Sequence, residues 1–504
     1  MMKTLLRLLC TLWLFAAACA SAQTLRVGLA EDPDVLDPTL ARTFVGRIVF
    51  AALCDKLVDI DEKLAIVPQL ATSWEWSADS KALTMKLRPG VTFHDGEKLD
   101  AAAVKFNLER HKTMPGSNRR GELAPLAGVD VVDPLTVKLN LSAPFSPLLA
   151  ALADRAGMMV SPKAAQAAGA NFGAKPVCSG PFRFVERVAQ DRITLERYDG
   201  YWNKADVHVE RITYTPIPDA TVRLANLRSG QLDFIERVAP SDMEKLAAEK
   251  KLKVARVTEI GYQGLTINVG KSDMAQKTPL GRDARVREAL ELSIDRQGLV
   301  QVVMDNEAVP GNQWVAPSNP YYAKNMPLPK RDVARAKALL KEAGVPNPTV
   351  TLLTPTTSDA QRLALVVQAM AREAGFDIKI QSTEFATSLN LADKGEFEAY
   401  LLAWSGRADP DGNVFSFHGC KQPLNYAGYC NADTDALLNQ SRSARDPAER
   451  RKVYEQIATR VLKERPIIYL YHRNWLWAYT PKLAGVRGVP DGLLRVTGLK
   501  LAAP

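Results

Sequence analysis

One short segment places a guanidinium group beside two carboxylates; it reads Trp404-Ser405-Gly406-Arg407-Ala408-Asp409-Pro410-Asp411-Gly412-Asn413. An arginine can hold a carboxylate or a phosphate through two parallel hydrogen bonds. Two neighbouring carboxylates can also work as an acid and a base. Alternatively, Arg407 pairs with Asp409 or Asp411 inside a turn, because Asp-Pro-Asp-Gly is a turn sequence. The segment predicts an anion site or a closed turn.

Other catalytic or metal-binding patterns are missing from the sequence. It contains no Gly-x-Ser-x-Gly nucleophile elbow and no His-Glu-x-x-His metal motif. Its five histidines are scattered without metal-ligand spacing. We therefore expect that the protein is not an enzyme and that it binds no metal and no cofactor. The histidines are His94, His111, His208, His418 and His472.

The N-terminus resembles a cleavable secretory signal peptide over residues 1–22. Lys3 and Arg7 precede an apolar run, and Ala20-Ser21-Ala22 supplies the small residues of a cleavage site. The run is shorter than the roughly 20 residues that span a bilayer. Lipidation at Cys19 is an alternative, but the bulky residue three positions before that cysteine is missing. We expect cleavage before Gln23 and a periplasmic protein.

Length and charge narrow the functional class further. Without the signal peptide the chain has about 480 residues, which is too many for one compact hydrophobic core. The formal net charge of +9 falls to +7 without Lys3 and Arg7, and no basic run is present. Nucleic acid is therefore not an expected partner.

Four cysteines remain in the mature chain, and an even number in an oxidising compartment favours disulfides. Cys420 and Cys430 flank a short loop and are the natural local pair. Cys54 and Cys178 would then form a long-range bond, with buried free thiols as the alternative. A zinc site of His418, Cys420 and Cys430 lacks a fourth ligand and the usual cysteine spacing.

Strand-like and helix-like segments alternate along the chain, which predicts a mixed α/β protein. Aspartates at positions 100, 283 and 295 are expected to cap helices. Residues 349–353, 359–375 and 378–381 read as a strand, a helix and a second strand, as in a βαβ unit. A helix is also expected from Pro329 to Gly344, and another from about Arg42 to Leu57.

Several segments in fixed order resemble the peptide- and nickel-binding class of ABC-transporter solute-binding proteins. The most specific runs from Ala71-Thr72-Ser73-Trp74 through Leu87-Arg88-Pro89-Gly90-Val91-Thr92-Phe93-His94-Asp95-Gly96. The others are Pro176-Val177-Cys178-Ser179-Gly180-Pro181-Phe182, Tyr201-Trp202, Asp283-Ala284-Arg285-Val286-Arg287-Glu288-Ala289-Leu290, Asn425-Tyr426-Ala427-Gly428-Tyr429 and Pro466-Ile467-Ile468.

This resemblance implies a large, class C type two-lobed periplasmic-binding-protein fold with an extra subdomain inserted in the first lobe. The first lobe would cover residues 23–268, with the insertion at about 58–175, and residues from about 480 to 504 would complete it. The second lobe would cover 269–479, so the chain crosses the hinge twice. A small peptide or peptide-like solute would be buried between the lobes and delivered to an inner-membrane permease by a monomer.

The resemblance also implies which segment lines the cleft. In relatives that bind peptides, an aspartate after the strand pairs with the α-ammonium group, and Arg407 stands in its place here. Asp409 and Asp411, which lie slightly later, would be the residues to substitute for that aspartate. Weaker cleft candidates, each with an equally simple structural role, are Thr43 and Phe44 at a helix start, Trp314 in a loop, and Thr354 after a strand.

Two other functions fit parts of the sequence. An exported hydrolase of small peptides or glycans would use a carboxylate pair such as Asp409 and Asp411. A carrier of a metal chelate or haem would hold the chelate through arginine rather than histidine. Both remain alternatives to peptide capture.

Overall fold

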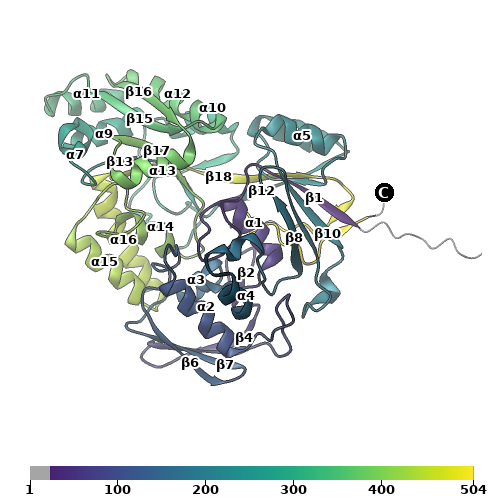
Figure 1. Cartoon of the computed structure of the whole chain (residues 1–504). Helices are drawn as coiled ribbons and strands as arrows, with labels where there is room; N and C mark the ends of the chain where they lie inside the picture. The colour runs from purple at the N-terminus through teal and green to yellow at the C-terminus, as the bar shows by residue number, and fades with distance from the viewer. Residues whose placement is uncertain (1–22, 503–504) are drawn as a thin grey trace, which may run out of the picture.

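The computed structural model describes residues 23–502, with only the backbone of Ser358 and Ala386. The expected signal peptide, with Cys19, lies outside this range. Two lobes lie side by side, and a smaller sheet unit lies below them in the view of Figure 1. The strand β18 (Ile467–Tyr479) runs from one lobe into the other.

The first lobe is built on the sheet order β8-β9-β10-β1-β11, extended by the second half of β18 and by β12. Parallel pairing of β1 with β10 and β11 brings the carboxyl ends of these strands to one edge. Its elements are β1 (Thr24–Leu29), α1 (Phe44–Leu53), β8 (Phe182–Val188), β9 (Arg192–Arg197), β10 (Arg211–Pro216), α5 (Ala220–Arg228), β11 (Phe234–Ile235), α6 (Met243–Ala248), β12 (Lys253–Thr258), β19 (Leu483–Ala484) and β20 (Lys500–Leu501).

The smaller unit is inserted after α1 and has its own hydrophobic core. A four-stranded antiparallel sheet, β4-β5-β7-β6, packs against α2. Its elements are β2 (Val58–Ile60), β3 (Ile66–Pro68), β4 (Ala71–Trp76), β5 (Ala82–Leu87), α2 (Ala101–Thr113), β6 (Leu126–Asp133), β7 (Thr136–Leu141), α3 (Leu148–Leu152) and α4 (Pro162–Ala168).

The second lobe has the sheet order β16-β15-β17-β13, joined to the first half of β18. The expected βαβ unit is confirmed, because β15 and β16 pair in parallel around α12. Its elements are β13 (Tyr262–Ile267), α7 (Met274–Lys277), α8 (Pro279–Arg282), α9 (Ala284–Ser293), α10 (Arg296–Met304), β14 (Ala308–Pro310), α11 (Val333–Glu342), β15 (Thr349–Pro355), α12 (Ser358–Arg372), β16 (Asp377–Thr383), α13 (Phe385–Lys394), β17 (Ala399–Trp404), α14 (Asp411–His418), α15 (Ala432–Ser443) and α16 (Pro447–Glu464).

Helix starts follow the predicted caps. Asp100, Asp283 and Asp295 each accept a hydrogen bond from a backbone N–H in the first turn of their helix. The helix expected from Pro329 begins at Val333 instead, because Asp332 supplies the cap. The helix expected over 42–57 is shorter, since α1 ends at Leu53 and the next residue, Cys54, is extended.

Both predicted cysteine pairs are disulfides in the structure. Cys54 is bonded to Cys178, which ties the end of α1 to the loop before β8. Cys420 is bonded to Cys430 across the loop between α14 and α15. With both sulfurs oxidised, these two cysteines have no thiolate to offer a zinc ion. Within residues 23–502 no group of three or more His, Cys, Asp or Glu side chains is placed to hold a metal.

The chain crosses twice between the first lobe and the second lobe, and these two crossings form the hinge. The first crossing lies between β12 and β13, at Glu259–Gly261, and the second lies within β18 near His472. The first crossing precedes the division expected near Asn268, because β13 already pairs with β17 of the second lobe. Among the helices of the described chain, none is long and apolar enough to cross a membrane.

Candidate functional site

The Trp404–Asn413 segment leaves the end of β17 and is fixed against the hinge. Gly406 has a φ of +78°. It lies so close to Ile260 that a Cβ atom on residue 406 would be 2.3 Å from the Ile260 carbonyl carbon. Asn413, which is almost fully buried, accepts hydrogen bonds from Trp404 Nε1 and from the Arg407 N–H at 2.9 and 2.8 Å. Its Nδ2 group donates to the Ile260 carbonyl at 2.9 Å. Glycine and asparagine thus shape the segment.

Arg407 points across the interface between the lobes. Its Nε atom lies 3.3 Å from Asp154 Oδ2, and its Nη2 atom lies 3.5 Å from Glu122 Oε1. Its guanidinium carbon lies 4.6 Å from the centre of the Trp404 ring. Both acids belong to the inserted unit, whereas Arg407 belongs to the second lobe.

The alternative in which Arg407 pairs within its own turn is therefore wrong. Asp409 binds Arg450 through two hydrogen bonds of 2.6 Å. Asp411 Oδ1 lies 3.2 Å from Arg442 Nε. Each aspartate already has its own arginine from α15 or α16, so Arg407 is left for a partner in the other lobe.

Arg407 belongs to a group of six buried or half-buried ionic side chains, here called the interlobe charge cluster. Asp154 Oδ2 also pairs with Arg47 Nη2 at 2.8 Å. Glu122 Oε1 pairs with Arg119 Nη1 at 2.5 Å. The cluster consists of Arg47, Arg119, Glu122, Asp154, Arg155 and Arg407.

The cluster carries four guanidinium groups and two carboxylates, which is a surplus of two positive charges. Beside it, Lys56 and Arg495 pair with Asp59 and Asp491, so these four side chains together add no net charge. Buried charge is costly unless it is paired. The cluster therefore favours a further anion.

The pKa values in the cluster reflect burial first and neighbouring charges second. Burial lowers the pKa of Arg47, and burial together with the charge of Arg119 lowers the pKa of Arg155. Burial alone would raise the pKa of Asp154, but Arg47, Arg407 and Arg155 outweigh it and hold that pKa well below its ordinary value. These three arginines therefore favour the ionised form of Asp154.

Donor atoms of the cluster are left over for a ligand. Arg47 Nη1, Arg119 Nε and Arg155 Nε are buried and have no hydrogen-bond partner. A carboxylate oxygen beside any of these atoms would accept a charge-assisted hydrogen bond, and Arg47 is the one of the three arginines that lines the cavity described next. Sequence reasoning did not single out these three arginines, because they come from α1, the loop after α2 and the loop after α3.

A narrow cavity adjoins the cluster. The centre of a water molecule can move within about 10 Å³ of this cavity, so the cavity holds roughly one water molecule. A solute of peptide size needs the lobes to separate first, as in a hinge motion. The cavity is lined by Arg47, Ile60, Ala150, Ala153, Asp154, Ile260, Arg407, Ala408 and Asp491.

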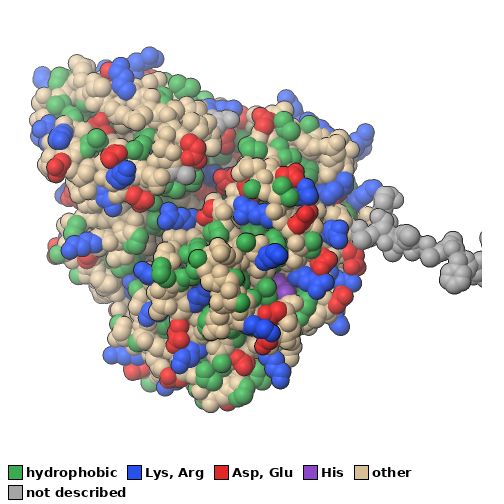
Figure 2. Space-filling model, viewed as in Figure 1, with side chains coloured by type: hydrophobic (Ala, Val, Ile, Leu, Met, Phe, Trp, Pro, Cys, Tyr) green, Lys and Arg blue, Asp and Glu red, His purple; other side chains and the backbone are tan. Residues whose placement is uncertain are grey.

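The two hinge crossings are bonded to each other. Glu259 Oε1 accepts a hydrogen bond from the Arg473 N–H at 3.0 Å, and His472 Nδ1 contacts the Gly261 carbonyl. Burial raises the pKa of Glu259 to about 7. Figure 2 shows the surface hollowed where the two lobes face each other, with acidic and basic side chains around the hollow.

The remaining predicted residues divide between the interface and the core. Thr43 precedes α1 and donates to Asp34 Oδ1 at 2.8 Å. Phe44 stacks on Trp475 at 4.2 Å, and the Arg47 guanidinium lies 5.9 Å from its ring centre. Phe44 therefore borders the charge cluster.

Trp314 and Thr354 lie elsewhere. Trp314 is fully buried and packs against Tyr454 and Tyr469 in the second lobe. Thr354 is also fully buried, with its hydroxyl 3.5 Å from the Ala360 carbonyl. Ser405 is half-buried beside Trp404. We leave Trp314 and Thr354 out of the proposed solute site.

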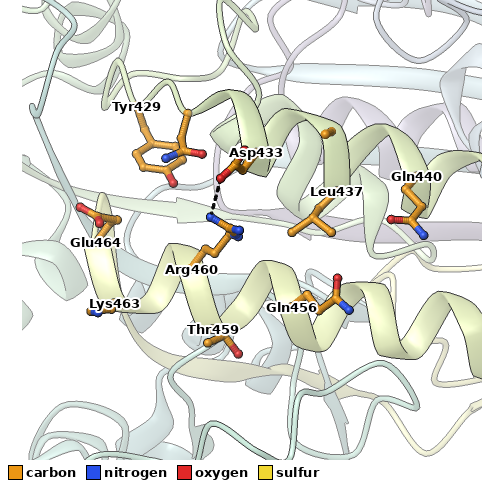
Figure 3. Close-up of a pocket in the computed structure, with 11 residues that line it drawn as sticks. Tyr429, Asp433, Leu437, Gln440, Gln456, Thr459, Arg460, Lys463 and Glu464 are labelled. Carbon is orange, nitrogen blue, oxygen red and sulfur yellow. Dashed lines mark hydrogen bonds and ion pairs between the residues drawn. The ribbon is translucent and has the colours of Figure 1, made fainter.

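A larger groove, of about 720 Å³, lies between α15 and α16 (Figure 3). Arg460 and Asp433 form an ion pair of 3.0 Å across it. All of its lining residues belong to the second lobe, so lobe closure would not enclose a solute there. We place the candidate site at the lobe interface instead.

Two lobes on a shared hinge, with ionic side chains from both meeting between them, define a two-lobed binding protein. Residues 65–425 match the model of the bacterial extracellular solute-binding proteins, family 5. The chain belongs to this family of solute-binding proteins.

Two relatives are similar over nearly the whole chain. The glutathione-binding protein GsiB of Pectobacterium atrosepticum is 30% identical, over 95% of this chain and 96% of that protein. The periplasmic binding protein AgaA of A. tumefacien R10, in complex with agropinic acid, is 27% identical with a TM-score of 0.86, over 95% and 99% of the chains.

A third comparison concerns the fold alone. The Escherichia coli murein tripeptide-binding protein MppA, 23% identical, superposes with a TM-score of 0.86 over 96% of this chain and 99% of its own. Its unliganded open form gives a TM-score of only 0.72, over 96% and 98%.

Proposed function

We propose that this protein captures a small acidic peptide or peptide-like solute between its lobes and delivers it to an ABC permease. The observation that carries the proposal is the surplus of two positive charges in the interlobe charge cluster. An anionic solute would compensate that surplus and would contact both lobes through Arg47 and Arg407. Contacts with both lobes are what favour the closed state.

The names of the relatives agree with an acidic solute. GsiB is a glutathione-binding protein and AgaA was solved with agropinic acid. Arg407, in place of the aspartate expected for an α-ammonium group, supports an anionic contact at that position. Asp409 and Asp411 are each engaged by an arginine, which makes them poor substitutes for that aspartate.

The setting of the proposed function is the periplasm, reached through the signal peptide over residues 1–22. We propose that the protein works as a monomer with an inner-membrane permease and without catalytic activity. We place the lobe divisions at the two hinge crossings, Glu259–Gly261 and the His472 region, with the insertion at about 58–175.

A carrier of a metal chelate remains the second candidate, since a chelate held by its carboxylates would suit the same arginines. The hydrolase alternative has less support, because Asp409 and Asp411, its carboxylate pair, are ion-paired with Arg450 and Arg442.

Thermal-shift screening of the solute-free protein tests the proposal. The screen should contain reduced glutathione, its diethyl ester, neutral and acidic dipeptides, opines and metal chelates. A free carboxylate-bearing peptide or opine at 100 times its Kd should stabilise the folded state by about 2.7 kcal/mol. Equal shifts with the ester, or a shift with chelates alone, would contradict an acidic peptide-like solute. Product formation from a stabilising solute would contradict a carrier.

A further inference from the structure

A second contact between the inserted unit and the second lobe uses none of the residues of the charge cluster. The Ser146 N–H, between β7 and α3, donates to the Arg442 carbonyl at 2.8 Å. The Ser146 hydroxyl donates to the Ala444 carbonyl. Both acceptors lie at the end of α15, so the contact joins two parts of the chain that belong to opposite sides of the interface.

The Arg442 side chain reinforces this contact. Its guanidinium carbon lies 3.8 Å from the ring centre of Phe415 in α14 and 4.6 Å from that of Phe145. Phe145 is 2% exposed and belongs to the core of the inserted unit. A flat guanidinium between two aromatic rings is attracted to both, because each ring presents a negative face. Arg442 therefore bridges one ring from each side.

Arg442 also reaches the Trp404–Asn413 segment. Its Nε atom lies 3.2 Å from Asp411 Oδ1, and the Asp411 N–H donates to Asp409 Oδ1 at 2.9 Å. The same arginine thus contacts the facing unit and the turn that carries Arg407.

None of these partners needs a solute. The acceptors opposite Ser146 are backbone carbonyls, and Phe145 and Phe415 are neutral rings. Their attraction does not depend on an anion in the interlobe charge cluster.

We propose that Phe145, Ser146, Arg442 and Ala444 form a clasp that holds the lobes together without solute. The clasp shifts the solute-free protein toward the closed form, so that a solute completes a closure already favoured. This inference goes beyond the proposed function and does not depend on the identity of the solute.

Interlobe distances measured in solute-free protein test the clasp directly. The four cysteines of the described chain are all in disulfides, so new cysteines can be labelled selectively. Val131→Cys on β6 and Val302→Cys on α10 are suitable, because these side chains are 45% and 57% exposed. Spin labels at both sites report the distribution of lobe separations.

The clasp variants are Ser146→Ala, which removes one hydrogen bond, and Arg442→Lys, which keeps the charge but loses the flat group between the rings. The matched control is Arg460→Lys, an exposed arginine ion-paired within the second lobe. We expect a predominantly short distance in the parent protein and in the control. Loss of one hydrogen bond should raise the open-to-closed ratio about fivefold, and the double variant should raise it further.

Two outcomes would overturn the clasp. One is a parent protein that is already mainly open without solute. The other is a distance distribution unchanged in the double variant while its thermal unfolding remains cooperative. Neither outcome bears on solute binding, so the proposed function is tested separately.

Discussion

Arg407 Nε lies 3.3 Å from Asp154 Oδ2, and this contact joins the second lobe to the inserted unit. Asp154 simultaneously holds Arg47 of the first lobe at 2.8 Å. One carboxylate thus links all three parts of the molecule, inside a cluster that still carries excess positive charge. An anionic solute would find the same arginines already gathered there.

Replacing Arg407 by alanine should weaken binding of an acidic peptide or opine. A charge-assisted hydrogen bond is worth roughly 1.5–3 kcal/mol, so the Kd should rise about tenfold to a hundredfold. Isothermal titration with the solute found by screening measures the change. Arg460→Ala, at an ion pair outside the interface, is the control and should leave the Kd unchanged. An unaltered Kd in Arg407→Ala would place this arginine outside the site.

Replacing Asp154 by asparagine should destabilise the solute-free protein, because Arg47, Arg155 and Arg407 lose their shared counter-charge. Removing one partner of a buried ion pair costs about 3–5 kcal/mol. An acidic solute should then stabilise the variant more than it stabilises the parent. Chemical denaturation with and without solute checks both effects; equal solute-induced stabilisation in the two proteins would argue against an anion bound at this cluster.

Asp411 gives the stability a defined pH dependence. Burial raises its pKa from 3.8 to about 6, although Arg442 opposes the rise. Between pH 3.8 and about 6, Asp411 is protonated in the folded protein and ionised in the unfolded chain. The protonated form therefore stabilises the folded protein fully below pH 4, and this stabilisation is lost as the pH rises through 6.

The variant Asp411→Asn isolates this effect. Between pH 4 and pH 7 the parent loses this contribution and the variant does not. The free energy of unfolding of the variant minus that of the parent should therefore increase by up to about 3 kcal/mol over this range. Urea denaturation at several pH values measures the difference between the two proteins. A difference that stays constant over this range would show that Asp411 titrates normally.

Loss of the Cys54–Cys178 disulfide should lower stability substantially. The bond closes a loop with a sequence separation of 124 and fastens the end of α1, the helix that carries Arg47. Paired substitution by alanine is expected to cost about 2–5 kcal/mol. The matched Cys420→Ala/Cys430→Ala protein, with a separation of only 10, should lose less. The reverse order in thermal unfolding would contradict the loop-length argument.

Local features of the fold were predictable because they depend on neighbours in sequence. Asp100, Asp283 and Asp295 cap helices because a short acidic side chain reaches the free N–H groups of the next turn. The βαβ unit of β15, α12 and β16 was also predictable, from periodicity. Helix ends were less predictable, as the start of α11 at Val333 shows.

The candidate site was only half predictable. The segment around Arg407 could be singled out by its residue types, but Arg47, Arg119 and Arg155 lie on separate elements with no motif between them. Trp314 was a weaker cleft candidate in sequence, and it packs in the second-lobe core against Tyr454. Aromatic rings serve a core and a binding site equally well, and sequence does not distinguish the two.

The sequence by itself determined the family resemblance and the helix caps and favoured the local Cys420–Cys430 pair, because each rests on residue order or local spacing. Only the tertiary structure decided what Arg407 faces. Asp409 and Asp411 are its near neighbours in sequence, but Arg450 and Arg442 occupy them. Asp154, far away in sequence, is brought to Arg407 when the lobes meet, because ion pairing depends on distance in space and on which charges remain uncompensated.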